Sequence, residues 1–262
     1  MRGTVRRCHA APMNRQEISR IAHAGHPIAA PLDDDSVRQL LDHGLPRGDE
    51  RVLDLGCGGG EWLLRALARH PRLRAEGVDI SAEALAHART GRSRTGRYGP
   101  SRPPSRGRRG FPLPAPVRPG AQRRGRARLR RPAAHPGGGP RAPGSRRAGP
   151  GGRVLVGDGF WDRTPSPEAV EMLGDFADLP TTLERVAADG WTPVHGHIST
   201  RRELDAYEWS WTGSLASWAL DRPDGPDRGE ALAVAEAHRT EWLRGYRDSW
   251  GFVSLVLRRT DG

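Results

Sequence analysis

The stretch that decides the fold is RVLDLGCGGGEWLLRALARH, residues 51–70. Three apolar residues near its start, Val52, Leu53 and Leu55, predict a short buried strand. The glycine cluster that follows turns the chain, and residues 62–70 have the pattern of a helix. The stretch therefore predicts a strand, a loop and a helix in succession.

The same alternation continues along the chain. Residues 74–80 (RAEGVDI) predict a second strand and residues 82–89 a helix, while residues 153–160 (RVLVGDGF) predict an apolar strand of the kind buried in parallel sheets. Further helices are predicted over 167–178, 181–189, 201–220 and 229–247, and further strands over 191–199 and 251–257. This alternation predicts an α/β fold, a Rossmann-like parallel or mixed sheet covered by helices.

The N-terminal part is predicted to hold two short helices. Residues 1–12 show no periodicity, so we expect a disordered leader, with Met13 as the genuine start. One helix is predicted from Asn14 to about His23, and a second begins at the acidic residues 33–35 and ends near residue 44. We assign residues 13–90 to these helices and to the first half of the α/β domain, and residues 151–262 to its second half with a Trp-rich cap.

The glycine loop resembles the first motif of class I S-adenosylmethionine-dependent methyltransferases. The motif runs apolar residues, an acid, then G-x-G-x-G, and here the acid is Asp54 and the glycines are Gly56, Gly58 and Gly60. Asp79 follows at the end of the second predicted strand. An acid at that place is shared with nicotinamide-binding Rossmann domains, but the D-x-G-x-G-x-G pattern favours the methyltransferase interpretation. The other alternative for Asp79 is a solvated strand-end acid.

The resemblance implies S-adenosylmethionine as the cofactor. Glycines in the loop let an adenosyl ligand approach the backbone, and the helix that follows offers free N–H groups. Asp54 would bind the amino group of the methionine moiety, and Asp79 the ribose hydroxyls. The implied cofactor-binding residues are Asp54, Gly56, Cys57, Gly58, Gly60, Asp79 and Ile80, with Ile80 against the adenine.

Other stretches carry the same resemblance. Residues 150–156 (PGGRVLV) are similar to the turn and fifth strand of this fold, and ISRIAHAGHPIAAPL at 18–32, DGFW at 158–161 and DAYEWSW at 205–211 look like bacterial small-molecule methyltransferases. The resemblance covers about 14–90 and 151–259, and implies transfer of a methyl group to an unidentified small-molecule acceptor. It also implies the sheet order 3-2-1-4-5-7-6, in which strands three and four would fall in the part that does not match.

Residues 91–150 depart from everything around them. They hold 17 Arg and no acidic residue, and 48 of the 60 are Arg, Pro, Gly or Ala, so we expect a disordered segment without packed strands or helices. Three interpretations compete: an arm that binds nucleic-acid phosphates, a flexible linker, and an out-of-frame translation. The third is favoured because wrong-phase reading of a GC-rich gene gives these four residues, and because the segment replaces strands three and four rather than adding to the usual distance. The nucleic-acid-binding alternative for the whole protein rests on this segment.

Composition limits the remaining possibilities. The net charge of +11 belongs to residues 91–150, because the rest of the chain holds 25 Arg against all 31 acids. Two cysteines exclude a disulfide framework, and the chain shows neither a membrane span nor the apolar core of a signal peptide. We therefore expect a cytoplasmic protein that does not associate with membranes.

Candidates for the acceptor side are less defined, and the sequence names no catalytic base beyond guesses at Asp158 and His195. His195 and His197 share a strand face, where ordinary strand positions are favoured over a metal or base. His23 and His26 fall where the resemblance places a lid over the cofactor. A hydrophobic substrate wall is predicted from Trp161, Tyr207 and Trp211, although tryptophans spaced along a helix are also typical of a core.

Overall fold

The computed structural model describes residues 13–81, 84–86, 88 and 151–261. The first part contains α1 (Arg15–Ala22), α2 (Asp34–Gly44), β1 (Arg51–Leu55), α3 (Glu61–Arg69) and β2 (Arg74–Val78). The second part contains β3 (Arg153–Trp161), α5 (Pro167–Leu173), α6 (Leu179–Ala188), β4 (Trp191–Ile198), α7 (Arg201–Leu220), α8 (Arg228–Glu241), a π-helical turn (Trp242–Tyr246) and β5 (Trp250–Arg259). The expected leader 1–12 and the segment 91–150 lie outside the described residues.

Local signals explain most of the element boundaries. The side chain of Asn14 accepts a hydrogen bond from the Glu17 amide at the start of α1, and Asp33 does the same for Ser36 at the start of α2. The helix predicted over 167–178 ends earlier, at Leu173, because Gly174 follows with a φ of 107°. The helix predicted over 229–247 is α-helical only to Glu241 and then widens into the π-helical turn.

The described strands fall into two sheets. β1 and β2 pair in parallel, whereas β5 lies between β3 and β4 and pairs antiparallel with both. In the sheet order 3-2-1-4-5-7-6 that the resemblance implies, β2 and β1 correspond to positions 2 and 1, and β3, β5 and β4 correspond to positions 5, 7 and 6. Position 4, between β1 and β3, and position 3, beyond β2, hold no strand within the described residues. Those two strands would fall outside the described residues, so their absence from the chain stays a prediction.

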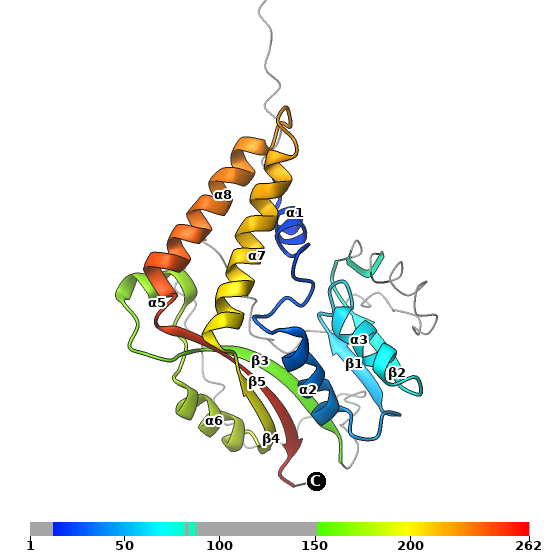
Figure 1. The fold of residues 1–262 in the computed structure, drawn as a ribbon. Helices are drawn as coiled ribbons and strands as arrows, with labels where there is room; N and C mark the ends of the chain where they lie inside the picture. Colours follow the sequence, from blue (N-terminus) through cyan, green and yellow to red (C-terminus); the bar gives the residue numbers. More distant parts are fainter. Residues whose placement is uncertain (1–12, 82–83, 87, 89–150, 262) are drawn as a thin grey trace, which may run out of the picture.

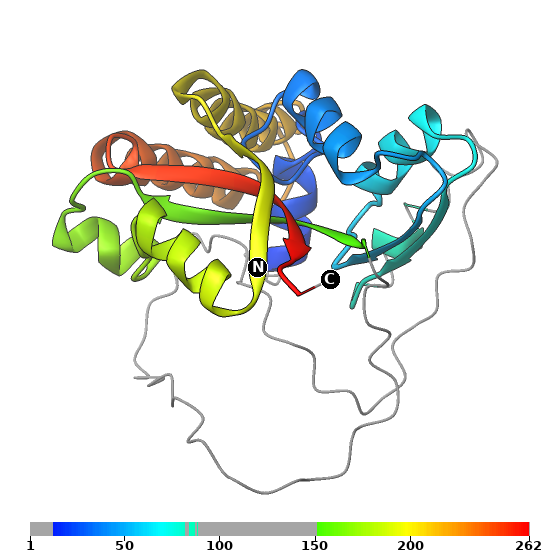
Figure 2. The ribbon, with the colours of Figure 1, turned by 90° about the horizontal axis from the view of Figure 1, so that it is seen from below.

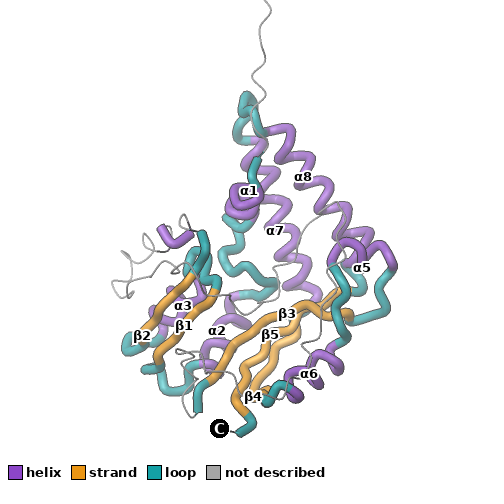
Figure 3. Tube along the Cα trace, turned by 180° about the vertical axis from the view of Figure 1, so that it is seen from behind, coloured by secondary structure: helices purple, strands orange, loops and turns teal. Residues whose placement is uncertain are grey.

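Helices cover both faces of the β3–β5–β4 sheet (Figure 2). Val253, Leu255 and Leu257 of β5 point to the face that α6 covers. Val256 points the other way, into a cluster with α2 and α3 that also includes Val52 of β1. This shared cluster holds the two sheets against the same helices, and the view from behind shows α2 beside both (Figure 3).

The predicted burial of the first strand is wrong for two of its three apolar residues. The exposed fractions of Leu53 and Leu55 are 57% and 55%, because in the described part of the chain no helix covers the face of β1 opposite α3. β3 is also less buried than predicted, because it is an edge strand of the described sheet with β5 as its one partner, and Val156 remains 37% exposed.

One carboxylate ties the start of two helices to the sheet. Glu203 forms a capping box with Thr200 at the start of α7. The same carboxylate accepts a hydrogen bond from the Asp33 amide before α2, at 3.1 Å, and lies 3.1 Å from Nε2 of His197 on β4. These contacts fix the start of α7 at the carboxyl end of β4, and further along its length α7 packs against α8 and α1 (Figure 1).

Candidate functional site

The glycine loop follows the carboxyl end of β1 and begins α3. Gly56, Gly58 and Gly60 have φ values of 80°, 50° and 77°, which side chains rarely adopt. The amides of Gly56 and Cys57 donate to the Val78 carbonyl of β2, at 2.7 and 3.1 Å. A methyl group placed on Gly56 or Gly58 would meet no atom within 4 Å. The loop therefore presents bare backbone to open space.

Asp79 is joined directly to this loop. One carboxylate oxygen accepts from the Gly58 amide at 2.8 Å, and the other accepts from the Ser81 amide at 2.7 Å. Each oxygen keeps a further lone pair for a ligand hydroxyl. Ile80, the next residue, is 92% exposed. The two motifs predicted from the sequence thus meet at one edge of the sheet.

Asp54 is the buried acid of the site. Its Oδ2 atom is buried without a hydrogen-bond partner. Burial, and next the nearby Asp79 carboxylate, raise the pKa of Asp54 to about 6. Burial, together with Asp54 and Asp79, also raises the pKa of the Cys57 thiol to about 11, so the thiol stays protonated at neutral pH.

These features fit an adenosyl cofactor with an amino group. A desolvated carboxylate next to a second carboxylate favours a cation, which would supply the partner that Asp54 Oδ2 lacks. The open space over Gly56 and Gly58 leaves room for close approach of a ligand to the backbone. The Gly60 N-cap of α3 adds the positive end of a helix.

The predicted substrate residues do not form one wall. Trp161 packs with Trp242, Tyr246 and Trp250, whereas Trp211 belongs to a different core cluster. Tyr207 lies between His23 and His26, with ring centroids 5.8 and 5.4 Å away. Only Tyr207 therefore lies beside the loop that joins α1 to α2.

The other candidates are spread over the sheet. His195 stacks on His43 of α2 with centroids 3.6 Å apart, and His197 contacts Glu203. Asp158 of β3 is separated from His195 of β4 by β5; burial raises the pKa of Asp158. Within the described residues no three His, Cys, Asp or Glu side chains are placed to hold a metal ion.

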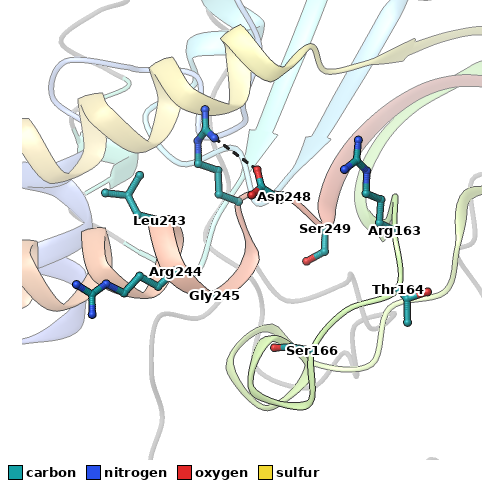
Figure 4. A pocket seen from close by; sticks show the side chains of 9 residues that line it. Arg163, Thr164, Ser166, Leu243, Arg244, Gly245, Asp248 and Ser249 are labelled. Carbon is teal, nitrogen blue, oxygen red and sulfur yellow. Dashed lines mark hydrogen bonds and ion pairs between the residues drawn. The ribbon is translucent and has the colours of Figure 1, made fainter.

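Two features were not predicted from the sequence. A buried network joins Glu208 of α7 to Nε2 of His238 on α8 at 2.7 Å and to the Tyr246 hydroxyl at 2.9 Å. A polar cavity of about 300 Å³ opens beside the π-helical turn, at the end of β3 (Figure 4). Its lining residues are Arg163, Thr164, Ser166, Leu243, Arg244, Gly245, Arg247, Asp248 and Ser249. No local pattern signals either feature, because the residues meet only through tertiary packing.

Comparison with known proteins defines the class of fold. A solved S-adenosylmethionine-dependent methyltransferase from Geobacter sulfurreducens, in complex with S-adenosyl-L-homocysteine, aligns over 95% of this chain and 100% of its own, with 18% identity and a TM-score of 0.68. The structure of YjhP from E. coli aligns over 92% of this chain and 99% of its own, with 18% identity and a TM-score of 0.67. The chain thus has the class I methyltransferase fold.

The family match lies in the part of the chain that holds the glycine loop. Residues 52–99, which include Asp54, the glycine loop and Asp79, match the family described as methyltransferase domain. The methyltransferase UngE' of Aspergillus campestris is 38% identical over 72 residues, 28% of this chain and 21% of that protein. The match spans about a fifth of that curated relative. The resemblance to class I S-adenosylmethionine-dependent methyltransferases is confirmed.

Proposed function

We propose that this protein is an S-adenosylmethionine-dependent methyltransferase of a small molecule, and that the chain as written, with residues 91–150 out of frame, is inactive. The single observation that carries the proposal is the junction of the Asp54 strand end, the bare glycine loop and Asp79. The buried, unpartnered Asp54 Oδ2 and the open space over Gly56 and Gly58 support it directly.

Each residue of this site has a proposed role. Asp54 binds the amino group of the cofactor, and Asp79 binds its ribose hydroxyls with the lone pairs left by the Gly58 and Ser81 amides. The backbone of residues 56–60 contacts the adenosyl part, and Ile80 covers one face of the adenine. The exposure of Ile80 leaves it free for that contact.

The cofactor would supply a methyl group already activated by a sulfonium. What the protein must add is alignment of the acceptor atom with that methyl group and exclusion of water, so a general base is not required for every acceptor. Asp54 and Asp79 fix the cofactor at two separated points, which sets its direction. Tyr207, beside His26 and the α1–α2 loop, is the proposed contact for the acceptor.

The proposed location is the cytoplasm. No helix in the described ranges combines the length and apolar character needed to cross a membrane. Cys57 is a free, buried thiol, which suits a reducing compartment.

For residues 91–150 we propose an out-of-frame translation. In the sheet order that the resemblance implies, one more strand belongs between β1 and β3, and no described strand occupies that position. The face of β1 that carries Leu53 and Leu55 is also exposed. No feature of the described residues favours the nucleic-acid-binding alternative. Translation of the gene in all three frames tests the proposal: a frame over this interval that encodes alternating apolar strands and helices is expected. Three frames without such a pattern would exclude it.

Ligand binding tests the proposed function. S-adenosylhomocysteine and NAD⁺ are titrated by calorimetry into the present chain and into a frame-restored version. We expect the restored version to bind S-adenosylhomocysteine and not NAD⁺, and the present chain to lack methyltransferase activity. Binding of NAD⁺ alone by the restored version would assign the site to the dinucleotide alternative.

A matched pair of variants separates the loop from general damage. Gly58→Asn adds a side chain over the open space, and Asn tolerates positive φ better than other residues. Gly151→Asn makes the same change at a φ of 83°, also in open space, before β3. Gly58→Asn should weaken S-adenosylhomocysteine binding by tenfold or more, about 1.4 kcal/mol, and Gly151→Asn should leave it unchanged. Equal losses of S-adenosylhomocysteine affinity in the two variants would mean that the glycine loop does not contact the cofactor.

A further inference from the structure

Helix α1 packs against the helical pair α7 and α8 through a small apolar cluster. Met13, Ile21 and Ala22 are buried against residues of the pair, among them Trp211 and Leu215. α1 lies across the side of α7 in Figure 1, and a loop connects it to α2. At 8 residues, α1 is too short to be stable without this packing.

An ionisable side chain ends this helix at the contact. His23 is the C-cap of α1, and its ring lies 5.8 Å from the Tyr207 ring of α7. Its Nδ1 atom is buried without a hydrogen-bond partner. A proton on that nitrogen would place a buried charge with no acceptor opposite it, which costs free energy unless the ring moves into water.

None of the groups around His23 is hydrogen-bonded to its Nδ1 atom. From α7, Tyr207 and Glu208 face it; from α8, His238; and from its own loop, His26. Glu208 attracts a protonated His23, but its two oxygens are bonded to His238 Nε2 and to the Tyr246 hydroxyl, and neither is bonded to His23 Nδ1. Protonated His26 or His238 would repel it. Burial, followed by His26, lowers the pKa of His23, while Glu208 opposes that shift.

We propose that α1 and the loop after it dock on α7 in a pH-dependent way and are released when His23 is protonated. The docked helix holds His23 neutral, and the undocked helix leaves its ring in water. Docking is therefore complete above the ordinary imidazole pKa of about 6.5. It weakens as the pH falls from that value through the lowered pKa of the docked state. The inference does not depend on methyl transfer.

Hydrogen exchange of the full chain tests this directly. The amides of Ile18 and His23, bonded to the carbonyls of Asn14 and Ser19, report α1, and the amides of residues 212–219 report α7. After correction for intrinsic rates, the protection of α1 relative to α7 should fall at least about threefold between pH 7.5 and pH 5.5. In His23→Gln, which cannot titrate, the ratio should not change with pH. A constant ratio in the unsubstituted protein would overturn the proposal.

One control variant and one further measurement keep the result specific. His43→Gln removes a histidine on α2 and should retain the pH-dependent loss, because His43 stacks on His195 rather than on α1. If α1 in His23→Gln loses as much protection between pH 7.5 and pH 5.5 as it does in the unsubstituted protein, protonation of His23 does not release the helix and the proposal fails. NMR titration of the His23 ring is the second measurement. A ring that protonates at or above its ordinary value while α1 stays protected would also overturn it.

Discussion

The two sheets of this protein bury their strands to very different extents. β5 lies between two partner strands and has helices on both faces, so Val253, Val256 and Leu257 are 5% exposed or less. β1 has one described partner and one covered face, and Leu53 and Leu55 on the other face are more than half exposed. The apolar residues of β5 are therefore buried by elements within the described residues. One face of β1, by contrast, is covered by none of the described elements.

One substitution in each half tests this difference most strongly. Leu215→Ala removes a fully buried side chain from α7 and should lower the free energy of unfolding by about 2–5 kcal/mol. Leu55→Ala removes a side chain that is 55% exposed. That change should alter the free energy of unfolding by only about 0.5 kcal/mol or less. Chemical denaturation of both variants measures the difference. Equal losses would mean that the β1 face is covered after all.

A second prediction concerns the carboxylate that joins the halves. Glu203→Gln weakens the hydrogen bonds from Asp33 and Thr200 and the contact with His197, so the free energy of unfolding should fall by about 1.5–3 kcal/mol. Burial alone would raise the pKa of Glu203, but hydrogen bonds from the Thr200 amide, the Ser36 side chain and the Asp33 amide outweigh it and lower the pKa to about 2.

The sign of its pH dependence follows from that lowered pKa. The contribution of Glu203 is complete above its unfolded value of 4.5, and it is lost as the pH falls through about 2. Denaturation curves between pH 6 and pH 2.5 should therefore converge for Glu203→Gln and the unsubstituted protein. A constant gap across this range would contradict the assignment. Arg38, in an exposed pair with Asp35 on α2, provides a surface control, since Arg38→Gln should leave the denaturation midpoint unchanged.

The third prediction concerns the proposed cofactor site alone. Burial and the nearby Asp79 carboxylate raise the pKa of Asp54 to about 6, and the frame-restored protein keeps both residues. Binding of an amino group requires the carboxylate, so affinity for S-adenosylhomocysteine should fall by up to about tenfold per pH unit below 6 and level off above 7. Calorimetry across this range measures it. In Asp54→Asn the slope should disappear, and persistence of the slope would assign the proton to another group.

The sequence predicted the parts that depend on local chemistry. Asn14 and Asp33 cap helices where predicted, and the glycine loop meets Asp79 because consecutive parallel strands end at the same edge. Burial could not be predicted in the same way. Leu53 and Leu55 have the pattern of a buried strand, and their exposure depends on what covers them in space.

Tertiary contacts account for the rest of what the sequence did not show. Glu208 and His238 are 30 residues apart, on helices whose pairing no local pattern specifies. Trp161 and Trp211 were expected on one wall, but the packing of β3 and α7 places them in separate clusters. The π-helical turn at 242–246 likewise has no signal in the helical periodicity.

Asp79→Ala tests most directly whether the glycine loop and the two aspartates bind an adenosyl cofactor. Calorimetric titration of S-adenosylhomocysteine into the frame-restored protein and into this variant compares their dissociation constants. We predict a loss of about 1.5–3 kcal/mol, the range for a hydrogen bond to a charged group. An unchanged dissociation constant would leave Asp79 with only the Gly58 and Ser81 amides as its partners and would contradict the proposed site.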